Sequence, residues 1–244
     1  MRIMLTVEYD GTNYSGWQRQ NNALSVQQVL EEAFYKLTGE ETAIVGAGRT
    51  DSGVHALGQC AHLDTDTNIP PEKLSYALNN LLPCDIRIRD SAAVTADFHA
   101  RKSAKSKHYR YTIYNAEHPC AVMRDYRAHV RYPLDTDKMA EAAAYIVGTH
   151  DFKCFQAAGS TPMENTVRTI TKLTVAKSGS VIDIDVYGTG FLYNMVRIIA
   201  GTLIEVGSGK RKPDSLTEVI ASKDRNTAGP TAPAKGLTLV SVEY

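Results

Sequence analysis

The sequence contains neither a long apolar run nor an excess of one charge. Hydrophobic residues make up 43% of its 244 residues, yet no apolar run approaches the roughly 18 residues needed to span a bilayer. Residues 1–10 alternate apolar and polar side chains and lack the apolar core of a signal peptide. The 27 basic residues balance 27 acidic ones, which argues against nucleic-acid binding by total charge alone. We therefore expect a globular, cytoplasmic protein of one large or two moderate domains, with no membrane partner.

Closely spaced metal-binding or disulfide-forming side chains are also missing. The four cysteines lie far apart in the sequence, which favours free thiols over disulfides or a zinc site; they are Cys60, Cys84, Cys120 and Cys154. The histidines show no ligand spacing at positions His55, His62, His99, His108 and His150. We therefore expect no metal site.

Two glycine-containing segments match nucleotide-binding loops only in part. Gly188 and Gly190 begin a dinucleotide fingerprint, but Tyr193 stands where its third glycine belongs. Residues 206–211 lack the first glycine of a phosphate loop, and Arg211 replaces the Ser or Thr that binds magnesium. Neither segment supports a nucleotide, and we expect a protein without a cofactor.

Strands and helices alternate through both halves of the chain, which predicts an α/β (α+β) fold. Period-two patterns predict strands at residues 3–9, 42–45, 58–63, 86–88, 108–114, 166–176, 181–188 and 237–242. Helical periodicity predicts helices from Ser25 to Gly39, from Pro70 to Pro83, at residues 137–147, at residues 191–206 and after Pro213. The basic stretch at residues 97–107 is the predicted boundary, giving an N-terminal domain 1–103 and a C-terminal domain 104–244 of similar style.

A glycine-rich turn at residues 46–56 carries the reactive side chains Arg49, Thr50 and Asp51. Glycines allow positive φ angles and close approach of another molecule, and the flanking predicted strands would brace the turn. An ordinary structural turn is the alternative, because Asp and Gly are common in turns.

This turn resembles the signature of the TruA family of tRNA pseudouridine synthases. The resembling segments occur in the same order as in that family and cover almost the whole chain: residues 48–56 (GRTDSGVHA), 9–18 (YDGTNYSGWQ), 107–111 (KHYRY), 190–197 (GFLYNMVR), 228–233 (AGPTAP) and 236–237 (GL). The resemblance implies two similar sheet-and-helix halves that flank a central RNA-binding cleft, in a chain that forms a homodimer.

The resemblance also implies a reaction and its residues. Uridines at positions 38, 39 and 40 in the anticodon stem-loop of tRNA are the implied substrate, with no DNA partner. Asp51 matches the nucleophile, Tyr109 the residue that stacks on the target base, and Arg197 the residue that keeps the aspartate ionised. Arg197 also lies off the apolar stripe of its predicted helix, so it can reach a neighbouring loop. Arg49 is expected both among the catalytic residues and in contact with the substrate, and Arg110 and Lys107 are the further expected contacts to the substrate.

Two basic runs fit an RNA partner but also fit a solvated surface. They are Arg101, Lys102, Lys105, Lys107 and Arg110, and Lys210, Arg211 and Lys212. Trp17 is either a base-stacking platform or, with more support, an anchor within its loop. Two rival functions remain: a non-catalytic RNA-binding module, and another uridine-modifying enzyme such as a methyltransferase.

Overall fold

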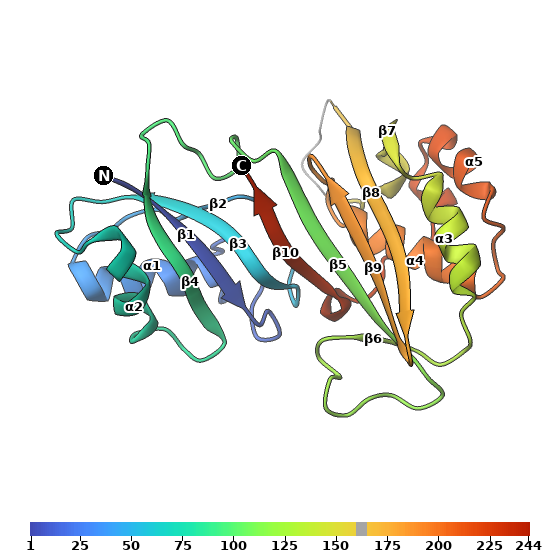
Figure 1. Cartoon of the computed structure of the whole chain (residues 1–244), viewed down its shortest axis with the longest axis horizontal. Coiled ribbons are helices and arrows are strands. Elements are labelled where there is room, and N and C mark those ends of the chain that lie inside the picture. Colours follow the sequence, from blue (N-terminus) through green and yellow to red (C-terminus); the bar gives the residue numbers. More distant parts are fainter. Residues whose placement is uncertain (160–164) are drawn as a thin grey trace. The chain divides into compact units, whose positions relative to one another are not determined.

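The computed structural model describes residues 1–159 and 165–244, which fold as a mixed α/β protein. The chain forms two compact units, one of residues 1–105 with residues 238–244 and one of residues 106–237 (Figure 1). The sequence prediction placed the boundary after residue 103 and assigned the whole C-terminal part to the second domain. In the structure, the closing strand lies in the first unit because it pairs with a strand there.

The first unit is built on a sheet in the strand order β4-β1-β3-β10 (Figure 1). The strands are β1 (Arg2–Tyr9), β3 (His55–Asp64), β4 (Ile86–Val94) and β10 (Leu237–Glu243), and the short β2 (Val45–Gly46) also pairs with β3. Strands β3 and β4 both run antiparallel to β1, whereas β10 runs parallel to β3. The helices of this unit are α1 (Val26–Thr38) and α2 (Pro71–Asn79).

The elements of the first unit follow from local sequence signals. Alternate residues of β1 are buried, as the period-two pattern predicts, so one face of the strand packs into the core. Helix α1 begins after Ser25, whose side chain accepts a hydrogen bond from the Gln28 backbone N–H, and ends at Gly39 in the left-handed conformation. Its buried residues, with those of α2, complete this core; they are Val26, Leu30, Ala33, Phe34, Leu74 and Leu78.

The second unit contains the strand order β5-β9-β8-β7 (Figure 1). Its strands are β5 (Ser106–Asn115), β7 (Gly148–Asp151), β8 (Val167–Ser178) and β9 (Val181–Gly188), with β6 (Ala128–Val130) parallel to β5. Its helices are α3 (Thr136–Ala144), α4 (Met195–Gly207) and α5 (Ser215–Ser222), with the 3-10 turns η1 (Lys153–Phe155), η2 (Arg225–Thr227) and η3 (Ala234–Gly236). Strands β8 and β9 form the predicted hairpin.

Helix α4 begins later than its apolar pattern predicts. The pattern suggested a helix from Phe191, but the helix starts at Met195. Asn194, directly before it, has the left-handed backbone angles φ 59° and ψ 8°, which a residue inside a right-handed helix does not adopt. Residues 191–194 therefore form a turn into the helix, and α4 then buries most of its circumference.

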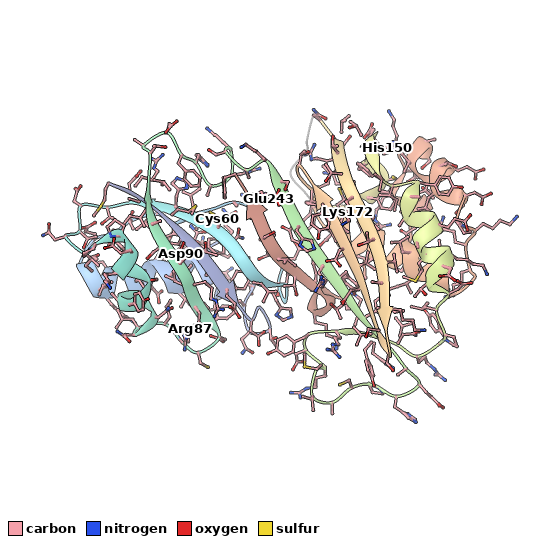
Figure 2. All side chains as sticks on the ribbon, viewed as in Figure 1. Cys60, Arg87, Asp90, His150, Lys172 and Glu243 are labelled. Carbon is pink, nitrogen blue, oxygen red and sulfur yellow. The ribbon has the colours of Figure 1, made fainter. Side chains whose placement is uncertain are left out.

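All four cysteines are free thiols, and Cys60 lies buried on β3 (Figure 2). Across residues 1–159 and 165–244, no three His, Cys, Asp or Glu side chains gather as metal ligands. Within the same residues, each helix is too short or too polar to cross a bilayer.

Candidate active site

The glycine-rich segment forms a loop between β2 and β3 in the first unit. Asp51 and Val54 are the ends of a tight turn, in which the Val54 backbone N–H donates to the Asp51 carbonyl at 3.1 Å. Gly53 has φ +76°, a conformation that glycine adopts without strain. The Asp51 side chain is half-buried and that of Arg49 is exposed. The loop therefore presents both side chains from one short, braced segment.

A second loop, at residues 14–17, holds the glycine-rich loop by main-chain contacts. Tyr14 O accepts hydrogen bonds from the Gly53 N–H at 3.2 Å and from the Ser52 hydroxyl at 3.3 Å. Gly16 lies so close to Thr50 that an added Cβ would come within 2.2 Å of the Thr50 carbonyl oxygen. The two loops therefore pack against each other through residues on both sides of Asp51.

Trp17 is part of this loop packing and does not form an exposed platform. Its side chain is only 3% exposed, and its backbone N–H donates to Thr50 O at 3.2 Å. The indole lies against Gly46, where an added Cβ would come within 2.5 Å of the indole nitrogen. The interpretation of Trp17 as a loop anchor is confirmed.

In the second unit, Tyr109 lies on β5 and is 7% exposed. Its ring meets the ring of Phe191 edge to face, with 5.1 Å between the ring centroids. Tyr111 is fully buried, and its hydroxyl donates to Pro233 O at 2.9 Å. Because side chains alternate along a strand, Lys107 shares the strand face of Tyr109 and Tyr111. Of the two tyrosines on this face, Tyr109 lies nearer the start of β5 and is the less deeply buried.

Arg197, in the first turn of α4, is held by two groups of the second unit. Its Nε donates to Ala232 O at 2.8 Å, and its Nη1 donates to the Asn194 side-chain oxygen at 2.9 Å. The backbone contact is reciprocal, because the Ala232 N–H donates to Arg197 O at 3.1 Å. Arg197 therefore does reach a neighbouring loop, as its place off the apolar stripe predicts. Both contacts restrict the direction of the guanidinium.

Arg110 lies on the opposite face of β5 from Tyr109. Its guanidinium pairs with Asp185 of β9, at 2.9 Å from Nε to Oδ1, and this raises the pKa of Arg110 above its ordinary value. His108 Nε2 lies 2.5 Å from the same carboxylate oxygen, and the His108 ring stacks on Tyr187 at 4.0 Å. The structure therefore separates Arg110 from the strand face that carries Tyr109.

The sequence reading missed the cluster of Asp185 with His108 and Arg110. The only available signal was the alternation of β9, which places Asp183, Asp185 and Tyr187 on one face. Lys172 of β8 continues this cluster, with its Nζ 5.5 Å from the Tyr187 ring centroid; the residue is marked in Figure 2. His108 and Asp185 of this cluster are buried and Arg110 is exposed, so the charges are paired at the edge of the core.

The two basic runs differ in their surroundings. Arg101, Lys102 and Lys105 are exposed in the segment between β4 and β5. In the second run, Arg211 pairs with Glu205 at 3.1 Å and Lys210 lies over the ring of Tyr132 at 5.9 Å. Two residues of the second run, Lys210 and Arg211, thus contact other side chains of the protein.

Comparison with known proteins assigns the chain to a family. A family model described as tRNA pseudouridine synthase matches residues 5–101 and 142–244. A relative from Ruminiclostridium cellulolyticum is 54% identical over 244 residues, which is 100% of this chain and 99% of the relative. Relatives from Thermoanaerobacter sp. (strain X514) and Brevibacillus brevis are 52% identical over 242 residues and 49% identical over 243, covering 99% and 100% of this chain and 99% of each relative. All three bear the name tRNA pseudouridine synthase A, and the chain belongs to the tRNA pseudouridine synthase family.

Proposed function

We propose that this protein converts uridines of tRNA to pseudouridine, at positions 38, 39 and 40 of the anticodon stem-loop. Membership of the family supports the class of reaction. The braced loop that presents a half-buried Asp51 is the structural observation that supports it.

The reaction moves the glycosidic bond from N1 to C5 of the same base and consumes no second substrate. The bond between ribose C1′ and uracil N1 breaks, the base turns, and a bond from C1′ to C5 forms; C5 then loses its proton and N1 takes one up, so the product is an isomer of the substrate. One carboxylate suffices as nucleophile, and we assign that role to Asp51. Attack at C6, attack at C1′ and assisted glycal formation all fit a carboxylate in this position.

The other expected residues have distinct proposed roles. Arg197 supplies a permanently charged guanidinium that favours the ionised form of the aspartate. Because a stacked uridine hides C6 and C1′, the nucleotide has to leave the helix, and Tyr109 stacks on the extruded base. Arg49 and Lys107 contact the RNA backbone near the extruded nucleotide. Arg110 also contacts RNA in this proposal, but separately from base stacking, because it lies on the other face of β5.

The same proposal covers partners and location. The exposed basic run of Arg101, Lys102 and Lys105 contacts tRNA phosphates, which makes binding sensitive to salt. Two copies of the chain form a homodimer, which doubles the basic surface, and the enzyme works in the cytoplasm.

Incubation of the wild-type protein with unmodified tRNA tests the function. Tritium release from uridine labelled at C5 is expected without any added cofactor, and mapping of the product is expected to find pseudouridine at positions 38, 39 and 40. Binding of tRNA without tritium release favours the non-catalytic RNA-binding module. Modification that requires a methyl donor favours the methyltransferase.

The Asn194→Gly variant tests the role of Arg197. Glycine keeps the left-handed backbone at φ 59° but removes the oxygen that orients the guanidinium. We expect kcat to fall about tenfold, because the guanidinium loses one of the groups that orient it. This fall corresponds to a rise of about 1.4 kcal/mol in the activation free energy, and little change in Tm is expected. Asn194→Asp retains an acceptor and is expected to keep most of the activity.

Lys223→Gly is the matched control for the Asn194 variants, because Lys223 is also a left-handed residue, with φ 55°. Its side chain pairs with Asp151 at 3.0 Å, and neither of these two residues has a proposed role in the reaction. Wild-type kcat is expected for this variant. An Asn194→Gly enzyme with full kcat contradicts the role given to Arg197.

A further inference from the structure

The residue directly before Asp51 takes part in a buried pair of hydroxyl groups. Thr50 Oγ1 lies 2.8 Å from the hydroxyl of Tyr9, the last residue of β1. Tyr9 is 2% exposed and Thr50 is 8% exposed, so water does not compete for this hydrogen bond. We propose that the Tyr9–Thr50 hydroxyl pair fixes the direction in which the Asp51 carboxylate leaves its loop. Both are positioning residues, and the inference rests on the proposed function of Asp51.

The pair fixes one side of Thr50, and the main chain fixes the other. The Thr50 carbonyl accepts the Trp17 N–H at 3.2 Å and lies in close contact with Gly16. With side chain and carbonyl both held, the peptide that leads into Asp51 has little freedom to rotate. The next turn is closed by the hydrogen bond from the Val54 N–H to Asp51 O. The Asp51 backbone is therefore fixed on both sides, and its Cα–Cβ bond has a defined direction.

A third contact holds the loop before Thr50. Gln59 of β3 is fully buried, and its Nε2 donates to Gly48 O at 2.9 Å. Two neighbouring strands thus reach the loop by side chains: β1 through Tyr9 and β3 through Gln59. Neither contact uses a residue that has a proposed role in the reaction itself.

Burial also decides the protonation state of Tyr9. Removal from water disfavours the phenolate and raises the pKa of Tyr9 well above its ordinary value. The phenol therefore stays neutral at any pH at which the enzyme works, and the pair does not titrate. A neutral phenol fits a fixed hydrogen-bonding anchor.

The test uses variants that separate the hydroxyl groups from the packing. Thr50→Val keeps the shape of the side chain and removes its hydroxyl, and Tyr9→Phe does the same at the partner. We expect each variant to lower kcat for tritium release about tenfold while KM for tRNA changes less than about twofold. Thr50→Ser keeps the hydroxyl and is expected to restore most of the activity. The double variant is expected to lose no more than the worse single variant, because the two hydroxyls act as one unit.

Ser91→Ala controls for general loss of stability. Ser91 is a buried hydroxyl of the same unit, which accepts the Ser75 N–H at 2.9 Å and donates to Pro71 O at 2.6 Å. We expect this variant to have a lower Tm but a wild-type kcat at a temperature where it is folded. Equal losses of kcat in Ser91→Ala and Thr50→Val at the same loss of Tm overturn the proposal.

Further outcomes decide between the explanations. Full kcat in Thr50→Val, or an equal loss in Thr50→Ser and Thr50→Val, contradicts the positioning role. If Thr50→Val does not fold, Tyr9→Phe decides by the same criteria, because its ring still fills the core. A wild-type protein without tritium release refutes the proposed function, whereas an active wild type with fully active variants refutes only this inference.

Discussion

The Asp51→Asn enzyme is expected to form no detectable pseudouridine while it binds tRNA within about tenfold of the wild type, a change of at most about 1.4 kcal/mol. Asparagine has nearly the shape of aspartate but no nucleophilic carboxylate. The hydrogen bond from the Val54 N–H that closes the turn uses the Asp51 backbone carbonyl, which the substitution retains. Tritium release from C5-labelled tRNA and a filter-binding titration measure the two quantities on the same preparation.

A surface carboxylate of the same unit provides the control for this variant. Asp90 is exposed on β4 (Figure 2), so Asp90→Asn removes the same charge far from the loop in sequence. Its rate of tritium release is expected to equal that of the wild type. A substantial rate in Asp51→Asn, or an equal loss in both variants, is incompatible with Asp51 as the nucleophile.

Gly16→Ala is expected to give the second-largest effect, on stability and activity together. Gly16 has φ +84°, and its added Cβ would lie 2.2 Å from the Thr50 carbonyl oxygen. The left-handed backbone of an alanine costs about 1–2 kcal/mol. Overlap in a packed site costs about 1–3 kcal/mol more. The overlap also pushes Thr50 aside, and Asp51 with it, so kcat is expected to fall in the fraction that remains folded.

Gly39→Ala separates backbone strain from overlap. Gly39 ends α1 with φ +76°, but no atom lies within 4 Å of the Cβ that alanine would add. This variant is expected to lose only the strain contribution, and its kcat is expected to stay at the wild-type value. Denaturant unfolding gives the free energy of unfolding of both variants. Equal losses for Gly16→Ala and Gly39→Ala would show that the close approach of the two loops is unimportant.

Strong local signals were sufficient to predict several elements of the fold. The alternation of β1, the Ser25 cap of α1 and the hairpin of β8 and β9 all occur as expected, because each depends on residues close in sequence. The strand predicted at residues 42–45 is instead the two-residue β2, which begins at Val45. Before it, the Ile44 N–H donates to the Glu31 side chain of α1, a long-range contact that replaces strand pairing.

The candidate site was predictable as a set of residues but not as a set of contacts. The glycines around Asp51 indicated a special backbone, and the resemblance to the family indicated the chemistry. The contact between Tyr9 and Thr50 joins residues 41 positions apart, and the Asp185 cluster joins residues more than 70 positions apart. Such pairs depend on strand register, which local patterns do not determine.

The parallel pairing of β10 with β3 has a consequence for synthesis of the protein. Thr238 pairs with His55 and Leu239 with Ala56, directly after the loop that carries Asp51. During translation, the ribosome makes that loop long before β10, the strand that pairs with the start of β3. The first unit of a nascent chain therefore stays incomplete until residues 237–243 have left the exit tunnel.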